Sequence, residues 1–269
     1  MSSRSSIRDR HWSTVIVAGH ECEIFSPPEP AADRAVIYLH DLRGRGLRET
    51  PGLCGLLETA RLPVIAPRTG RSWWIDRIVP GFDPAISPQR FVVEAVRDEV
   101  ARRFGVQPPR IAMIGSGMGG QGALQIAYRH PALFPVVAAI APAIDFHLAM
   151  REAGDRPDGE LFDTLWEVYG DVERARQDTA ILHVHPLNWP RQQFLASGPD
   201  DLHWHDGAAR LHGKLVALGI PHVAMLEPWA GSDDPATHGR AAAEALAFVC
   251  AALDQEARRL PQTPPAGGR

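Results

Sequence analysis

The sequence has few of the features that direct a chain to a membrane, to an oxidising compartment or to secretion. Only three cysteines, Cys22, Cys54 and Cys250, occur in 269 residues. Their odd number and wide spacing predict free thiols in a reducing environment. No apolar run is long enough to cross a bilayer, and residues 1–6 lack the apolar segment of a secretory leader. We therefore expect a cytoplasmic protein with no membrane partner.

Excess charge of one sign is also missing. The formal net charge is −4 and the charged share is 22%, so nothing in the composition suggests nucleic acid as a partner. The hydrophobic share of 45% is ordinary for a globular chain. A chain of this length suits one domain with a sizeable core, which we expect over residues 1–260. Residues 261–269 are rich in proline and glycine and predict a disordered tail.

Short apolar runs alternate with amphipathic segments along most of the chain. This alternation predicts an α/β fold, a mostly parallel central sheet covered by helices on both faces, with its site at the carboxyl ends of the strands. Between residues 145 and 188 the pattern gives short helices without strands and predicts a small helical cap insertion. Strands are expected at 12–17, 21–25, 36–39, 63–67, 111–114, 136–140, 193–196 and 223–226, and helices at 47–60, 88–104, 120–128, 206–218 and 235–253.

One stretch carries a chemical signature. An apolar strand at 111–114 runs into a glycine-rich turn and then a helix, which is the arrangement of the nucleophile elbow, Gly-x-Ser-x-Gly, of α/β-hydrolases. Gly115 and Gly119 fit the two outer glycines. The middle position, where the nucleophilic serine belongs, is Gly117, and the serine stands one residue earlier at Ser116. A dinucleotide-binding loop is excluded because the glycine spacing does not match Gly-x-Gly-x-x-Gly.

The chain resembles α/β-hydrolases of the esterase group over roughly residues 36–248 and is similar to bacterial esterase-D-like proteins. The most specific part is residues 115–124, where relatives carry serine at the Gly117 position. The resemblance implies a carboxylesterase or acyl hydrolase with a Ser-Asp-His triad, no cofactor, and a small ester or acyl-like molecule as partner. Further similar stretches are 67–74, 183–190 and 211–215.

Of the other two triad members, the acid is the better preserved. The resemblance places it at Asp201, with Asp200 as the alternative, although turn aspartates also commonly cap a following helix. For the histidine, relatives carry a Gly-His-Ser-Trp type motif after the last strand.

In this sequence Asp233 or Asp234 stands at the position of that histidine. His238 follows later, in the first turn of a helix that Pro235 would begin. It is the remaining candidate base and would reach the site if the helix began at Thr237. We expect it to lie further away or to face solvent.

The oxyanion hole of this fold needs only backbone donors, which we assign to the N–H groups of Met118 and Leu42. The family's His-Gly pair is here His40-Asp41, which adds a carboxylate beside a site for negative charge. The side chains that we expect to line a pocket are those of His40, Asp41, Trp73 and Trp74. The alternative for the two tryptophans is that they fill the core.

Histidine pairs at 183/185 and 203/205 have the spacing that places two side chains on one face of an extended segment. No cysteine or carboxylate cluster accompanies them in the sequence, so we expect no metal site.

Two functional hypotheses remain. The first is a catalytically impaired or non-catalytic homologue that keeps a binding site, because Gly117 offers no nucleophile. The second is an active carboxylic-ester hydrolase that uses Ser116, or a water activated by Asp201 and His238. The sequence leaves the ligand and the oligomeric state open.

Overall fold

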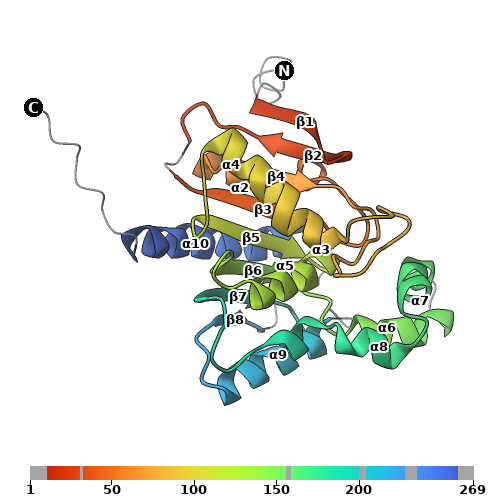
Figure 1. Cartoon of the computed structure of the whole chain (residues 1–269). Helices are drawn as coiled ribbons and strands as arrows, with labels where there is room; N and C mark the ends of the chain where they lie inside the picture. Colours follow the sequence, from red (N-terminus) through yellow and green to blue (C-terminus); the bar gives the residue numbers. More distant parts are fainter. Residues whose placement is uncertain are drawn as a thin grey trace, which may run out of the picture.

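The computed structural model describes residues 11–30, 33–155, 159–199, 201, 204–227 and 235–259. Its centre is one eight-stranded sheet with the order β1-β2-β4-β3-β5-β6-β7-β8 (Figure 1). The hairpin of β1 and β2 joins β4 in antiparallel fashion, and the other strand pairs are parallel. The strands are β1 (Trp12–Val17), β2 (His20–Phe25), β3 (Ala35–Leu39), β4 (Val64–Pro67), β5 (Ile111–Ser116), β6 (Val136–Ile140), β7 (Gln192–Ala196) and β8 (Val223–Met225).

Alternate residues of the strands pack on opposite faces of this sheet, as the two-residue period of a strand requires. In β3, Ile37 and Leu39 belong to the core on the side of α3, α4, α5 and α9. Val36 and Tyr38 face the other side, where the core is completed by α2 and α10. The sheet is therefore covered by helices on both faces, which confirms the predicted α/β architecture.

The helices follow the expected segments closely. The predicted helix at 47–60 is a short 3₁₀ turn followed by an α-helix, and the one at 88–104 is continuous with a π-helical middle. The helical segments are η2 (Leu47–Glu49), α2 (Pro51–Ala60), α3 (Pro88–Phe91), η3 (Val92–Val96), α4 (Arg97–Phe104), α5 (Met118–Arg129), α6 (Phe146–Glu152), η4 (Ala153–Asp155), η5 (Gly159–Phe162), α7 (Asp163–Tyr169), α8 (Val172–Gln177), η6 (Ala180–His183), α9 (His205–Ala217) and α10 (Pro235–Arg259).

β5, the strand that leads to the elbow, lies between β3 and β6 in the interior of the sheet. Short helices follow β6, and Figure 1 shows α6, α7 and α8 gathered to one side of the sheet. This is the segment for which the sequence predicts a cap. In the part of the chain that the structure describes, no helix combines the length and apolarity needed to span a membrane.

Candidate active site

The turn between β5 and α5 holds its middle residue in a strained conformation. Gly117 has φ 54° and ψ −117°, a region that residues with a side chain rarely adopt. Its N–H donates to the Ile140 carbonyl at 2.9 Å, and its own carbonyl accepts from the N–H groups of Gln121 at 3.1 Å and Ala143 at 3.0 Å. Gly117 thus lies at the tip of a strand–turn–helix with the backbone geometry that a nucleophile elbow imposes.

The two flanking glycines are required by packing. A Cβ on Gly115 would lie 2.1 Å from the Gly119 carbonyl oxygen, and one on Gly119 would lie 2.0 Å from the Leu39 carbonyl oxygen. At Gly117 the nearest atom to such a Cβ is the Asp41 Cβ at 3.6 Å, an ordinary van der Waals contact. The turn therefore has room for a side chain at Gly117 alone among these three positions.

Ser116 is the last residue of β5 and pairs with Ile140 of β6. It continues the row of Ala112 and Ile114, which pack with Ile140 in the core on the α10 side of the sheet. The α5 helix covers the opposite face, so Ser116 does not share the orientation of the elbow tip.

His40 joins the turn after β3 to the loop after β4. The residue is 3% exposed. Nε2 accepts from the Thr69 N–H at 3.2 Å, so Nδ1 carries the proton and donates to the Asp41 carbonyl at 2.8 Å. Burial lowers the pKa of His40 below its ordinary value. Both ring nitrogens are occupied by these bonds, which hold the turn in place.

The Asp41 carboxylate is bound within its own turn. One oxygen accepts from the Arg43 N–H at 3.0 Å and the other pairs with the Arg45 guanidinium at 2.9 Å. The sequence suggested that this negative charge would oppose an oxyanion, and the ion pair with Arg45 offsets part of that charge.

Of the two expected backbone donors of the oxyanion hole, Met118 begins α5, where the first amides have no acceptor within the helix. The role of Leu42 stays a prediction.

Asp201 follows β7 and is 7% exposed. Its carboxylate accepts from the Trp204 N–H at 3.2 Å, and its carbonyl accepts from the His205 N–H at 3.1 Å, so it holds the turn that leads into α9. The N-cap of α9 is Trp204 rather than this aspartate. A role in catalysis stays a prediction, and Asp200 lies outside the described residues.

The position of the expected base lies outside the described part of the chain. β8 ends at Met225 and the described chain stops at residue 227, so Asp233 and Asp234 carry no structural assignment. α10 begins at Pro235, which places His238 at its fourth residue. The His238 side chain also lies outside the described residues.

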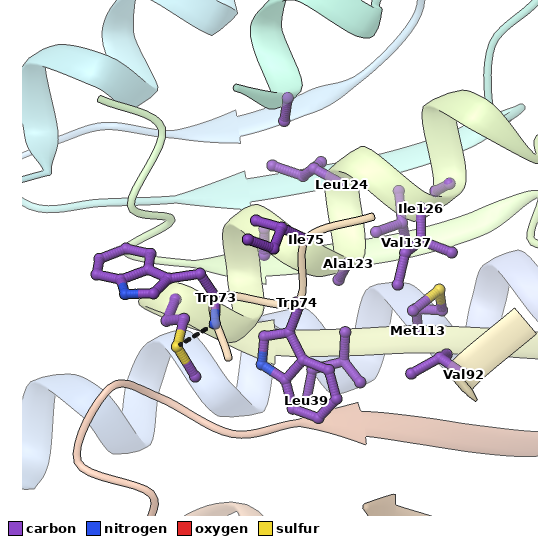
Figure 2. Packing of buried hydrophobic residues seen from close by; sticks show 14 of the residues in the cluster. Leu39, Trp73, Trp74, Ile75, Val92, Met113, Ala123, Leu124, Ile126 and Val137 are labelled. Atoms are coloured by element: carbon purple, nitrogen blue, oxygen red, sulfur yellow. Dashed lines mark hydrogen bonds between the residues drawn. The ribbon is translucent and has the colours of Figure 1, made fainter. Parts of the chain in front are cut away.

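Trp73 and Trp74 lie in the hydrophobic core with their side chains fully buried (Figure 2). The backbone N–H of Trp73 points at the Met118 sulfur at 3.2 Å, and Trp74 donates its ring N–H to the His40 carbonyl at 3.2 Å. A Cβ on Gly122 of α5 would lie 2.3 Å from the Trp74 Cβ. These contacts favour the packing role over the pocket wall.

Sequence reasoning missed the contacts that join the cap segment to α5. Gln121 accepts from the Ala180 N–H at 3.0 Å, and the Gln125 amide donates to the Asp178 carbonyl at 2.7 Å. Both glutamines are buried and stand four residues apart on one helix face, a spacing that would have identified them as a pair.

The structure describes both members of only one of the two histidine pairs, His183 and His185. His183 lies against Asp178 and Gln125, and His185 accepts from the Leu187 N–H. His203 lies outside the described residues. No group of three His, Cys, Asp or Glu side chains suited to a metal gathers within the described ranges.

The strand order, the elbow after β5 and the two-sided helical cover define an α/β-hydrolase fold. Comparison with solved structures agrees. The chain matches an S-formylglutathione hydrolase from Agrobacterium tumefaciens with a TM-score of 0.65 and 17% identity over 93% of this chain and 94% of that one. It matches the S-formylglutathione hydrolase FrmB from Staphylococcus aureus with a TM-score of 0.64 and 15% identity over 89% and 100%. Mycobacterium tuberculosis MPT51 gives 0.63 and 14% over 89% and 98%.

The family follows from the sequence. Residues 56–258 match the family model described as Putative esterase, so the chain belongs to that family. No curated protein matches the sequence significantly.

Proposed function

We propose that this protein descends from ester hydrolases but is catalytically impaired or non-catalytic, and that it binds a small ester or acyl-like molecule. The observation that carries the proposal is the conformation of Gly117. It holds the strained φ 54° and ψ −117° at the tip of the elbow and has no side chain to acylate. Room for a side chain exists there, so packing does not require the glycine.

The chemistry of the lineage explains the consequence. An elbow serine attacks the scissile carbonyl while an adjacent histidine takes its proton, and each step needs the hydroxyl at the tip. A protein with glycine at this position would have no covalent route.

Binding does not require the nucleophile. The first amides of α5, which have no acceptor within the helix, favour a carbonyl oxygen or a negatively charged acyl group, and Gly119 brings this helix start against the end of β3. These features support an acyl-like ligand at the elbow.

The second candidate is an active ester hydrolase that uses Ser116, or a water with Asp201 and His238. The observation in its favour is Asp201, a buried carboxylate that follows β7 two strands from the elbow. Against it, Ser116 lies on the strand row that packs with the α10 side of the sheet.

Covalent labelling separates the two candidates. We expect a serine-directed fluorophosphonate to leave the unchanged protein unmodified by intact mass, and to label Gly117→Ser combined with Asp234→His. Gly117→Ser alone should label slowly, because a serine at its ordinary pKa is a poor nucleophile without a base. A phosphonate adduct on Ser116 of the unchanged protein would contradict the proposal.

A further inference from the structure

Two histidines far from the elbow lie in direct contact. His212 is in the middle of α9, and His222 stands just before β8, the edge strand of the sheet. The His212 Nδ1 and the His222 Nε2 are 2.8 Å apart, and the two rings meet edge to face at 5.0 Å. Both side chains are half-buried, so solvent reaches the pair.

The hydrogen bonds fix which nitrogen holds each proton. The Ile220 carbonyl can only accept, so the His222 Nδ1 donates to it at 2.8 Å. The His222 Nε2 therefore presents a lone pair, and the His212 Nδ1 carries the proton between the rings. A histidine whose second nitrogen donates to a backbone carbonyl has the arrangement usual for metal ligands.

A buried amide lies on the neighbouring strand β7, at the level of His222. Phe194 of β7 pairs with Val223 of β8, so Gln193 stands beside His222 one position earlier. Residues in register share a face, and this is the face that α9 covers, because Leu195 and Leu211 meet in the same core.

The Gln193 amide donates to the Pro221 carbonyl at 3.3 Å. Gln193 is 1% exposed, and its side-chain oxygen has no hydrogen-bond partner among the residues that the structure describes. Buried polar atoms without a partner are uncommon and call for an explanation.

We propose that His212 and His222 bind one divalent transition-metal ion of the kind that prefers imidazole, with the Gln193 oxygen or water completing its coordination. No third His, Cys, Asp or Glu gathers here within the described residues, so the two imidazoles supply the selectivity. Zn²⁺, Ni²⁺ and Cu²⁺ suit such a site, whereas Mg²⁺ prefers oxygen ligands.

The pair would both open and turn to admit the ion. Two tetrahedral Zn–N bonds of about 2.0–2.1 Å separate their nitrogens by about 3.3 Å, so the two nitrogens would move apart from 2.8 Å by roughly half an ångström. Each ring would also turn, because in the hydrogen bond the two nitrogens point at each other and around an ion both point at the ion. His212 would move its proton from Nδ1 to Nε2 and ligate through Nδ1, with no net release of protons from neutral rings. The bound ion would join α9 to the edge of the sheet.

The test uses the untagged chain and Zn²⁺ in isothermal titration calorimetry. We expect one Zn²⁺ per chain, and a loss of affinity of about tenfold or more in His212→Ala and in His222→Ala. His185→Ala is the matched control, because His185 is an exposed histidine of the His-x-His pair that the sequence offered, and it should bind as the unchanged protein does. Mg²⁺ should give no saturable heat.

A spectroscopic measurement covers the case in which a variant fails to fold. With one equivalent of Cu²⁺ on the unchanged protein, electron paramagnetic resonance should show superhyperfine splitting from two nitrogen ligands. The proposal is overturned if Zn²⁺ does not saturate the chain, if binding persists in His222→Ala, or if the Cu²⁺ spectrum shows no nitrogen coupling.

Discussion

Gly119 at the start of α5 lies directly against the end of β3, so that a Cβ added to it would come within 2.0 Å of the Leu39 carbonyl oxygen. This approach presses the amino end of the helix onto the turn that holds His40 and Asp41. A Cβ added to Gly117, two residues earlier, would meet no atom closer than 3.6 Å. Packing therefore requires the glycine at Gly119 but does not require the one at Gly117.

This difference predicts an order of stability among glycine substitutions. Gly119→Ala forces backbone apart and should cost about 3 kcal/mol or more. Gly117→Ala has room but meets the strain of φ 54°, which costs about 1–3 kcal/mol. Gly213→Ala is the control: it lies exposed in α9 with open space around it and should stabilise by up to about 1 kcal/mol. Urea unfolding measures all three, and a Gly119→Ala protein as stable as Gly117→Ala would refute the packing argument.

The buried His40 predicts a loss of stability in acid. Its pKa is lowered from 6.5 by burial, so below pH 6.5 the unfolded chain takes up a proton that the folded chain refuses. The free energy of unfolding should therefore fall as the pH drops from 6.5 through the folded pKa, by up to about 1.4 kcal/mol per pH unit for this group. His40→Gln keeps a donor and an acceptor without titrating. It should flatten this part of the profile, and parallel profiles for the two proteins would show that His40 does not contribute.

The carboxylate of Asp178 interacts with His183, Tyr169 and Arg77. Its pKa predicts a second loss of stability in acid. Burial alone would raise its pKa, but hydrogen bonds from His183 and Tyr169 and the charge of Arg77 lower it to about 2. Its stabilising effect is present above pH 3.8, its ordinary pKa, and is lost as the pH falls toward 2.

Asp178→Asn should therefore destabilise the protein near neutral pH by about 1–3 kcal/mol, with the difference shrinking between pH 4 and pH 2. Asp171→Asn is the matched control, since Asp171 caps α8 through the Arg174 N–H and asparagine caps nearly as well. Thermal or urea unfolding across this pH range measures both, and an equal loss in the two variants would contradict the role given to Asp178.

The sequence predicted the parts of the molecule whose signals are local. The apolar run before Gly115 and the helix after Gly119 identified β5, α5 and the elbow, because period and glycine spacing depend on neighbouring residues. The same reasoning failed to decide between core and pocket for Trp73 and Trp74, since their burial depends on Gly122 of a distant helix. The contact of His212 with His222 depends on how α9 packs on β7 and β8, which no local pattern encodes.

Repair of the site gives a further prediction. Gly117→Ser alone should hydrolyse a short activated ester little better than the unchanged protein, because no base is placed beside it. Adding Asp234→His or Asp233→His supplies a base at one of the two positions to which the resemblance assigns the histidine, and only such a double variant should turn over. Full activity of Gly117→Ser alone would show that His238 already serves as the base.

The hydrolysis of a short activated ester by the unchanged protein tests the central claim most directly. Gly117 at the strained tip of the elbow leaves nothing to acylate, so the rate should not exceed that of a protein-free control, and Ser116→Ala should leave it there. Hydrolysis well above the control that Ser116→Ala abolishes would contradict the account and establish an active hydrolase.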